Sequence, residues 1–122
     1  MLKDQLKKRT KDFSLRVIRL VDSLPAKGAG QVIGHQLLRS GTSVGANYRS
    51  ACRAKLQADF INKVHICEEE ADESLYWMEL LVESGLVATE KLKDLMVETD
   101  ELVAIFSASV KTARANNSSK SK

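Results

Sequence analysis

Few residues in this chain have side chains of the kind that carry out catalysis or hold metal ions. It has two histidines, His35 and His65, and two cysteines, Cys52 and Cys67. A di-metal site in a helical bundle needs Glu-x-x-His on two helices and two further inward-facing glutamates, whereas this chain offers one reversed pair, His65 with Glu68. A Cys–His nucleophile is not favoured, because His65 and Cys67 lie two positions apart on one helix and point in different directions. We therefore predict no catalytic, metal or cofactor site, and no enzyme.

The charged residues indicate a second kind of chemistry, the binding of polyanions. Residues 1–63 hold 13 Lys and Arg against 4 Asp and Glu, whereas residues 64–122 hold 6 against 12. A basic half can bind the phosphates of nucleic acid. The same cations can instead pair with the acidic half, which includes "EEEADE" at 68–73, and the sequence leaves both interpretations open. The candidate nucleic-acid-binding residues are Lys7, Lys8, Arg9, Lys11, Arg16, Arg39, Arg49 and Arg53.

The stretch "RSGTSVGANYR" at residues 39–49 contains two glycines among small polar residues. A phosphate-binding loop needs a preceding strand and usually a lysine beside its last glycine, and this stretch has neither. A glycine inside a helix costs about 1 kcal/mol relative to alanine, which the close approach of another helix would offset. We therefore predict a close helix-packing face formed by Gly41, Val44, Gly45 and Tyr48.

Helices are the elements that must position these residues. Apolar residues recur in steps of three and four along 6–24, 33–51, 60–81 and 92–113, as expected for helices packed nearly parallel. Leu15, Ile18 and Val21 widen the first of these stripes, and no segment alternates like a strand. The spacing predicts an all-α, up-down-up-down antiparallel four-helix bundle over residues 1–115, followed by a disordered tail at 116–122.

The expected helix ends are marked unequally in the sequence. Pro25 ends the first helix, Gly85 suits a left-handed cap after the third, and Thr89 suits the start of the fourth. The turn between the second and third helices has no such marker. We place it near 55–58, with Asp59 in the first turn of the third helix.

Two segments, "QLLRSGTSVGANYRSACRAK" and "DFINKVHICEEEADESLYWMELLVESGLV", resemble a known family. This family comprises four-helix-bundle proteins encoded in intervening sequences of 23S ribosomal RNA genes, and the likeness covers roughly residues 12–112. A departure is "NYRSACRAKLQAD", where many members have a short acidic-glycine turn after the asparagine. The matching elements are Gln36, Leu38, Arg39, Ser43, Asn47 and Phe60.

The resemblance implies a bundle that assembles as a ring, commonly a homopentamer. It also implies kinship with the accessory protein of diversity-generating retroelements, a basic bundle that binds nucleic acid and the reverse transcriptase. A ring joins two unlike patches, which a chain with a basic half and an acidic half can provide. Tyr76, Trp77 and Leu80 lie partly off the seam of the third helix and are candidate interface residues. Alternatively, Trp77 is buried in its own core.

Together with the family resemblance, these patterns lead us to expect a non-enzymatic homo-oligomeric scaffold or adaptor of bacterial type. We expect it to bind RNA, DNA or a nucleic-acid-processing protein such as a reverse transcriptase through the basic residues of the first two helices. The alternative is a bundle that binds only proteins. The sequence lacks the roughly 20 apolar residues that span a bilayer and the apolar segment of a signal peptide, so we expect no membrane partner and a cytoplasmic location.

Overall fold

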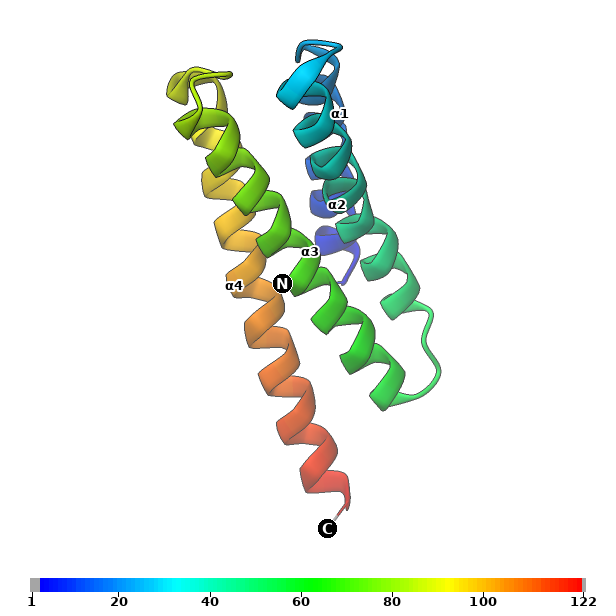
Figure 1. Ribbon diagram of the computed structural model, residues 1–122. Coiled ribbons are helices and arrows are strands. Elements are labelled where there is room, and N and C mark those ends of the chain that lie inside the picture. The colour runs from blue at the N-terminus through cyan, green and yellow to red at the C-terminus, as the bar shows by residue number, and fades with distance from the viewer. Residues whose placement is uncertain (1–2, 122) are drawn as a thin grey trace.

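The computed structural model describes residues 3–121, and the side chains of residues 3–117, as four α-helices joined by short loops (Figure 1). The helices are α1 (Lys3–Asp22), α2 (Gly28–Cys52), α3 (Gln57–Glu83) and α4 (Thr89–Ser121). Each helix packs against the next in the chain, and consecutive helices run in opposite directions. The predicted up-down-up-down four-helix bundle is therefore confirmed.

The core consists largely of residues at the predicted three–four spacing. Burying one large apolar side chain stabilises the fold by about 1.5–3 kcal/mol relative to leaving it exposed. The stripe on α1 is narrower than predicted, since Leu15 and Ile18 are 41% and 37% exposed. Both lie roughly 120–180° around the helix from its buried face. Fully buried side chains include Phe13 and Val17 on α1, Leu37 and Val44 on α2, Val64 and Met78 on α3, and Leu92 and Phe106 on α4.

The loops lie close to the predicted positions. Gly85 has a φ of 82°, so the left-handed cap predicted after the third helix is confirmed, and α4 begins at Thr89 as expected. The least marked turn occupies residues 53–56, about two residues before its predicted position. Asp59 does lie in the first turn of α3.

Glycines on one side of α2 allow α1 to approach it closely. A Cβ atom at Gly41 would lie 2.8 Å from Cγ1 of Val17, and one at Gly45 would lie 3.3 Å from the carbonyl oxygen of Thr10. Oγ of Ser14 lies 3.1 Å from the Thr10 carbonyl and 3.3 Å from the Gly41 carbonyl, so it can donate a hydrogen bond to either helix. The stretch 39–49 is thus a helical contact surface inside α2.

The other two residues of the predicted packing face point into the core. The carbonyl of Val44 lies 3.4 Å from the thiol of Cys67 on α3. The ring of Tyr48 packs against Phe106 of α4, with 6.0 Å between the ring centroids. The glycines and these two larger residues therefore contact different neighbours, because the face they share is wide enough to meet three helices.

The packing of α1 is unequal on its two sides. It lies along α2 but touches α4 over a much shorter length. A bidentate ion pair bridges the gap to α4: Nε of Arg9 lies 2.8 Å from Oε2 of Glu98, and Nη2 lies 2.6 Å from Oε1. α1 is therefore held mainly by α2.

α4 is the longest helix and reaches past the loop between α2 and α3 (Figure 1). Among the residues whose side chains are described, the last buried one is Ala113. The helix itself continues to Ser121, beyond residue 115, where the sequence predicts the start of a tail. The last of these buried side chains therefore lies eight residues before the end of α4.

Candidate nucleic-acid interface

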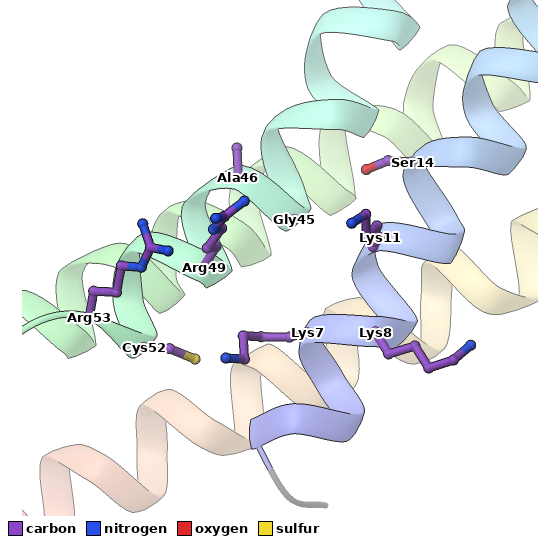
Figure 2. Close-up of a pocket in the computed structure, with 9 residues that line it drawn as sticks. All are labelled: Lys7, Lys8, Lys11, Ser14, Gly45, Ala46, Arg49, Cys52 and Arg53. Carbon is purple, nitrogen blue, oxygen red and sulfur yellow. The ribbon is translucent and has the colours of Figure 1, made fainter.

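A basic hollow of about 590 Å³ lies between α1 and α2, and we call it the basic groove. Five of its nine lining residues are cationic, and none is acidic or aromatic. Figure 2 shows Lys7 and Lys11 extending from α1 toward α2, whereas Lys8 extends away from it. The lining residues are Lys7, Lys8, Lys11, Ser14, Gly45, Ala46, Arg49, Cys52 and Arg53.

Helix geometry brings these cations together. Lys7 and Lys11 lie four residues apart on α1, and Arg49 and Arg53 lie four residues apart at the end of α2, so each pair forms one wall. Within a wall, the two positions are separated by about 6 Å along the helix. The walls are close together because the glycine contacts draw α1 toward α2.

Small residues line the middle and one end of the basic groove. Gly45 lies between the two cationic walls, and Ser14 and Ala46 lie at one end of them, beyond Lys11 and Arg49 (Figure 2). A larger residue at any of these positions would occupy the hollow. The same small residues that allow the helices to pack closely therefore leave room for an anionic ligand near the helix backbone.

Acidic neighbours neutralise the basic groove only at its edge. Lys7 lies 3.4 Å from Asp4, and Lys8 lies 2.8 Å from Asp12. The hydrogen bond to Asp12 raises the pKa of Lys8. Both pairs join residues on the exposed face of one helix, where such contacts contribute little to stability. Over the described residues, Lys11, Arg49 and Arg53 make no ion pair, so their charges are available to a ligand.

Arg9, Arg16 and Arg39, which the sequence also predicts as nucleic-acid-binding residues, lie outside the basic groove. Arg9 pairs with Glu98 and Glu101 of α4, and hydrogen bonding to Glu98 raises its pKa. Arg16 lines a separate hollow of about 500 Å³ that it shares with Arg9 and Glu98. The hollow also includes Lys8, which therefore lies between two concave surfaces.

Arg39 connects α2 to α3. Nη1 lies 3.2 Å from Glu70, and Nη2 hydrogen-bonds to Glu73. The bond to Glu73 raises the pKa of Arg39. Intramolecular pairing therefore engages Arg9 and Arg39, whereas the groove arginines remain free of ion pairs.

The predicted interface residues lie on the outer side of α3. Tyr76 is 52% exposed, and its ring meets Trp77 edge-on with 5.2 Å between the centroids. Nε1 of Trp77 donates a hydrogen bond to Glu73, and both Trp77 and Leu80 are partly buried. The indole is thus anchored to the chain's own surface, while the phenol is presented to solvent.

The histidines and cysteines are dispersed. His65 lies 3.5 Å from Glu68 and 3.8 Å from Glu69, and His35 is exposed on α2. Burial raises the pKa of the Cys67 thiol to about 12. The described residues contain no group of three or more His, Cys, Asp or Glu that could hold a metal ion. Cys52, by contrast, lines the basic groove. The sequence could have indicated this position, because Cys52 follows Arg49 by three residues on the same helix.

A sequence profile of the 23S rRNA-intervening sequence protein family matches residues 3–108. The chain belongs to this family. The match covers α1, α2, α3 and most of α4, so it includes both walls of the basic groove. No curated protein matches this family member.

A solved structure supports the same family fold. It is a protein of unknown function from the S23 ribosomal protein family of Bacteroides thetaiotaomicron, with 32% sequence identity and a TM-score of 0.79. The alignment covers 86% of this chain and 97% of the Bacteroides chain. Within residues 3–121, no helix of this family member is long and apolar enough to cross a membrane.

Proposed function

We propose that this family member is a non-enzymatic scaffold that binds nucleic acid through the basic groove. The observation that carries the proposal is a hollow lined by five cationic residues and no acidic residue, with four of the five on two walls from α1 and α2. Lys and Arg contacts to phosphates supply affinity and orientation but carry no sequence information. The expected ligand is therefore bound largely independently of its sequence.

The dimensions of the basic groove suit a phosphate backbone. Each wall places two cations about 6 Å apart along a helix. One strand of B-form DNA carries a phosphate about every 3.4 Å along the helix axis. Each wall therefore spans about two phosphates, and the small lining residues leave space for the strand between the walls.

We further propose that the chain forms a homo-oligomer, as the resemblance implies, with five copies in a ring. The exposed ring of Tyr76, with Trp77 and Leu80 beside it, is the candidate contact surface. Several basic grooves on one assembly would increase avidity for a long polyanion without any new contact in each copy. Such an assembly could present nucleic acid to a processing enzyme such as a reverse transcriptase.

The alternative is a bundle that binds only proteins. The ion pairs of Arg9 and Arg39 favour it, because they show that part of the basic half is already matched by acidic residues. An acidic protein surface could also occupy the basic groove. The two hypotheses differ in whether an oligonucleotide binds at all.

A salt titration of oligonucleotide binding tests the proposal. Fluorescence anisotropy would follow labelled RNA and DNA between about 50 and 200 mM salt. With up to five phosphate contacts, the logarithm of the binding constant should fall against the logarithm of salt concentration with a slope of about −4. Replacing Arg49 and Arg53 with glutamate should weaken binding and bring the slope nearer −2.

A matched control separates the groove from overall charge. Lys91→Glu with Lys93→Glu makes the same change in net charge on exposed residues near the start of α4, and we expect binding close to that of the unmodified protein. Equal loss in the two double variants would refute the basic groove as the site. No binding of any oligonucleotide at low salt would leave only the protein-binding alternative.

A further inference from the structure

A second hollow, of about 540 Å³, lies where the N-terminal turn of α1, the start of α3 and the last packed turns of α4 meet. It adjoins the basic groove along α1. Lys3 lines the second hollow and Lys7 lines the groove, one helical turn further along α1. Lys3 and Lys7 are about 6 Å apart along α1, so the two hollows are one helical turn apart on that helix.

The lining of the second hollow differs in chemistry from that of the basic groove. It includes the aromatic residues Phe60 and Tyr48, which the groove lacks, and only one cation, Lys3. Nζ of Lys3 lies 4.8 Å from the centroid of the Phe60 ring. That ring is partly buried, so one part packs on the protein while another faces the hollow.

Polar side chains surround the aromatic surface. Ser109, Thr112 and Asn116 follow one another at intervals of three and four residues, which places them on one face of α4. Gln57, the first residue of α3, lies across from them. In the part of the chain whose side chains are described, these four polar groups make no hydrogen bond, so their donors and acceptors are free for a ligand.

We propose that the second hollow accepts an unpaired nucleobase of the strand whose phosphates lie in the basic groove. This inference rests on the proposed function and specifies its ligand as single-stranded or locally unpaired nucleic acid. Unpaired bases are recognised by stacking on aromatic rings and by hydrogen bonds to amide and hydroxyl side chains. Phe60 supplies the ring, and Asn116 and Gln57 supply amides that can donate and accept.

Three oligonucleotides test this base site on the unmodified protein. They are a labelled 12-nucleotide DNA strand, the same strand with an abasic position moved along it, and the fully paired duplex of that sequence. The single strand should bind more tightly than the duplex. At least one abasic position should weaken binding by about tenfold, which corresponds to about 1.4 kcal/mol for a lost stacked base.

Protein variants test the same site from the other side. Phe60→Leu keeps an apolar side chain but removes the aromatic face, and it should weaken single-strand binding by about tenfold. The salt slope should not change, because no phosphate contact is lost. Asn116→Ala should also weaken binding, whereas Asn62→Ala, an exposed asparagine on α3, should not.

The outcomes distinguish the base site from the basic groove. If abasic strands, duplex and single strand all bind equally, the base site is refuted, while loss of binding in the Arg49 and Arg53 double variant still supports the groove. If no oligonucleotide binds, both are refuted. Should Phe60→Leu fail to fold, the abasic series decides, because it leaves the protein unchanged.

Discussion

Replacing Gly41 with alanine tests how the walls of the basic groove are held together. The added Cβ would lie 2.8 and 2.9 Å from the two γ-methyl groups of Val17, well inside the roughly 3.5–4.0 Å separation at which carbon atoms attract each other. Val17 is fully buried, and branching at Cβ restricts its rotation. The contact can therefore be relieved only by moving α1 away from α2.

Two opposing effects set the magnitude. Overpacking a helix contact costs about 1–3 kcal/mol, whereas alanine recovers about 1 kcal/mol of helix propensity relative to glycine. Gly41→Ala should therefore destabilise the protein by up to about 2 kcal/mol. With Val17→Ala already present, the two obstructing methyl groups are gone and only the Cβ atom of residue 17 remains close, at 3.2 Å. The same change should then cost up to about 3 kcal/mol less, and this difference is the coupling between the two positions.

Urea unfolding followed by circular dichroism measures this coupling. The four proteins of the double-mutant cycle should be compared at one protein concentration, because assembly would add to apparent stability. The coupling is zero if Gly41→Ala changes the free energy of unfolding by the same amount in the unmodified protein and in the Val17→Ala variant. The steric account of this helix contact would then be wrong.

Three further predictions concern the reactivity of the thiols, the pH dependence of stability and the assembly. At pH 8 a thiol reagent should modify Cys52 before Cys67, and bound oligonucleotide should slow the reaction of Cys52, because only Cys52 lines the basic groove; equal rates would contradict these positions. Because the pKa of Cys67 rises from 9.0 to about 12 on folding, the free energy of unfolding should decrease as pH rises between those values, as urea titrations over this range would measure. Light scattering should give five times the 13.5 kDa chain mass, about 68 kDa, and Tyr76→Asp should lower this value; a monomeric mass for the unmodified protein would refute the ring.

The helices could be predicted well because burial repeats with the helical period. Val17, Val44, Met78 and Phe106 all lie on the predicted seams and are fully buried. Leu15 was predicted less well: it is apolar, but hydrophobicity alone does not fix the direction in which a side chain points. The turn after α2 was displaced because Arg53 to Leu56 contain neither proline nor glycine to mark the end of the helix.

The candidate site could be predicted only in part. Spacing along one helix relates Lys7 to Lys11 and Arg49 to Arg53, so each wall of the basic groove is visible in the sequence. Which cations remain free is a tertiary property, since Arg9 finds its partner 89 residues away, on α4. The base site is harder still, because its aromatic and polar residues come from α2, α3 and α4 and share no sequence pattern.

The unequal packing of α1 has a consequence for the lifetime of the basic groove. The lysine wall belongs to α1, which packs mainly against α2. The arginine wall belongs to α2, which packs against both α1 and α3. Local opening of α1 would separate the walls and leave the other three helices in contact. A polyanion lying across both walls would oppose that opening, so backbone amides of α1 should exchange hydrogen more slowly when the ligand is present.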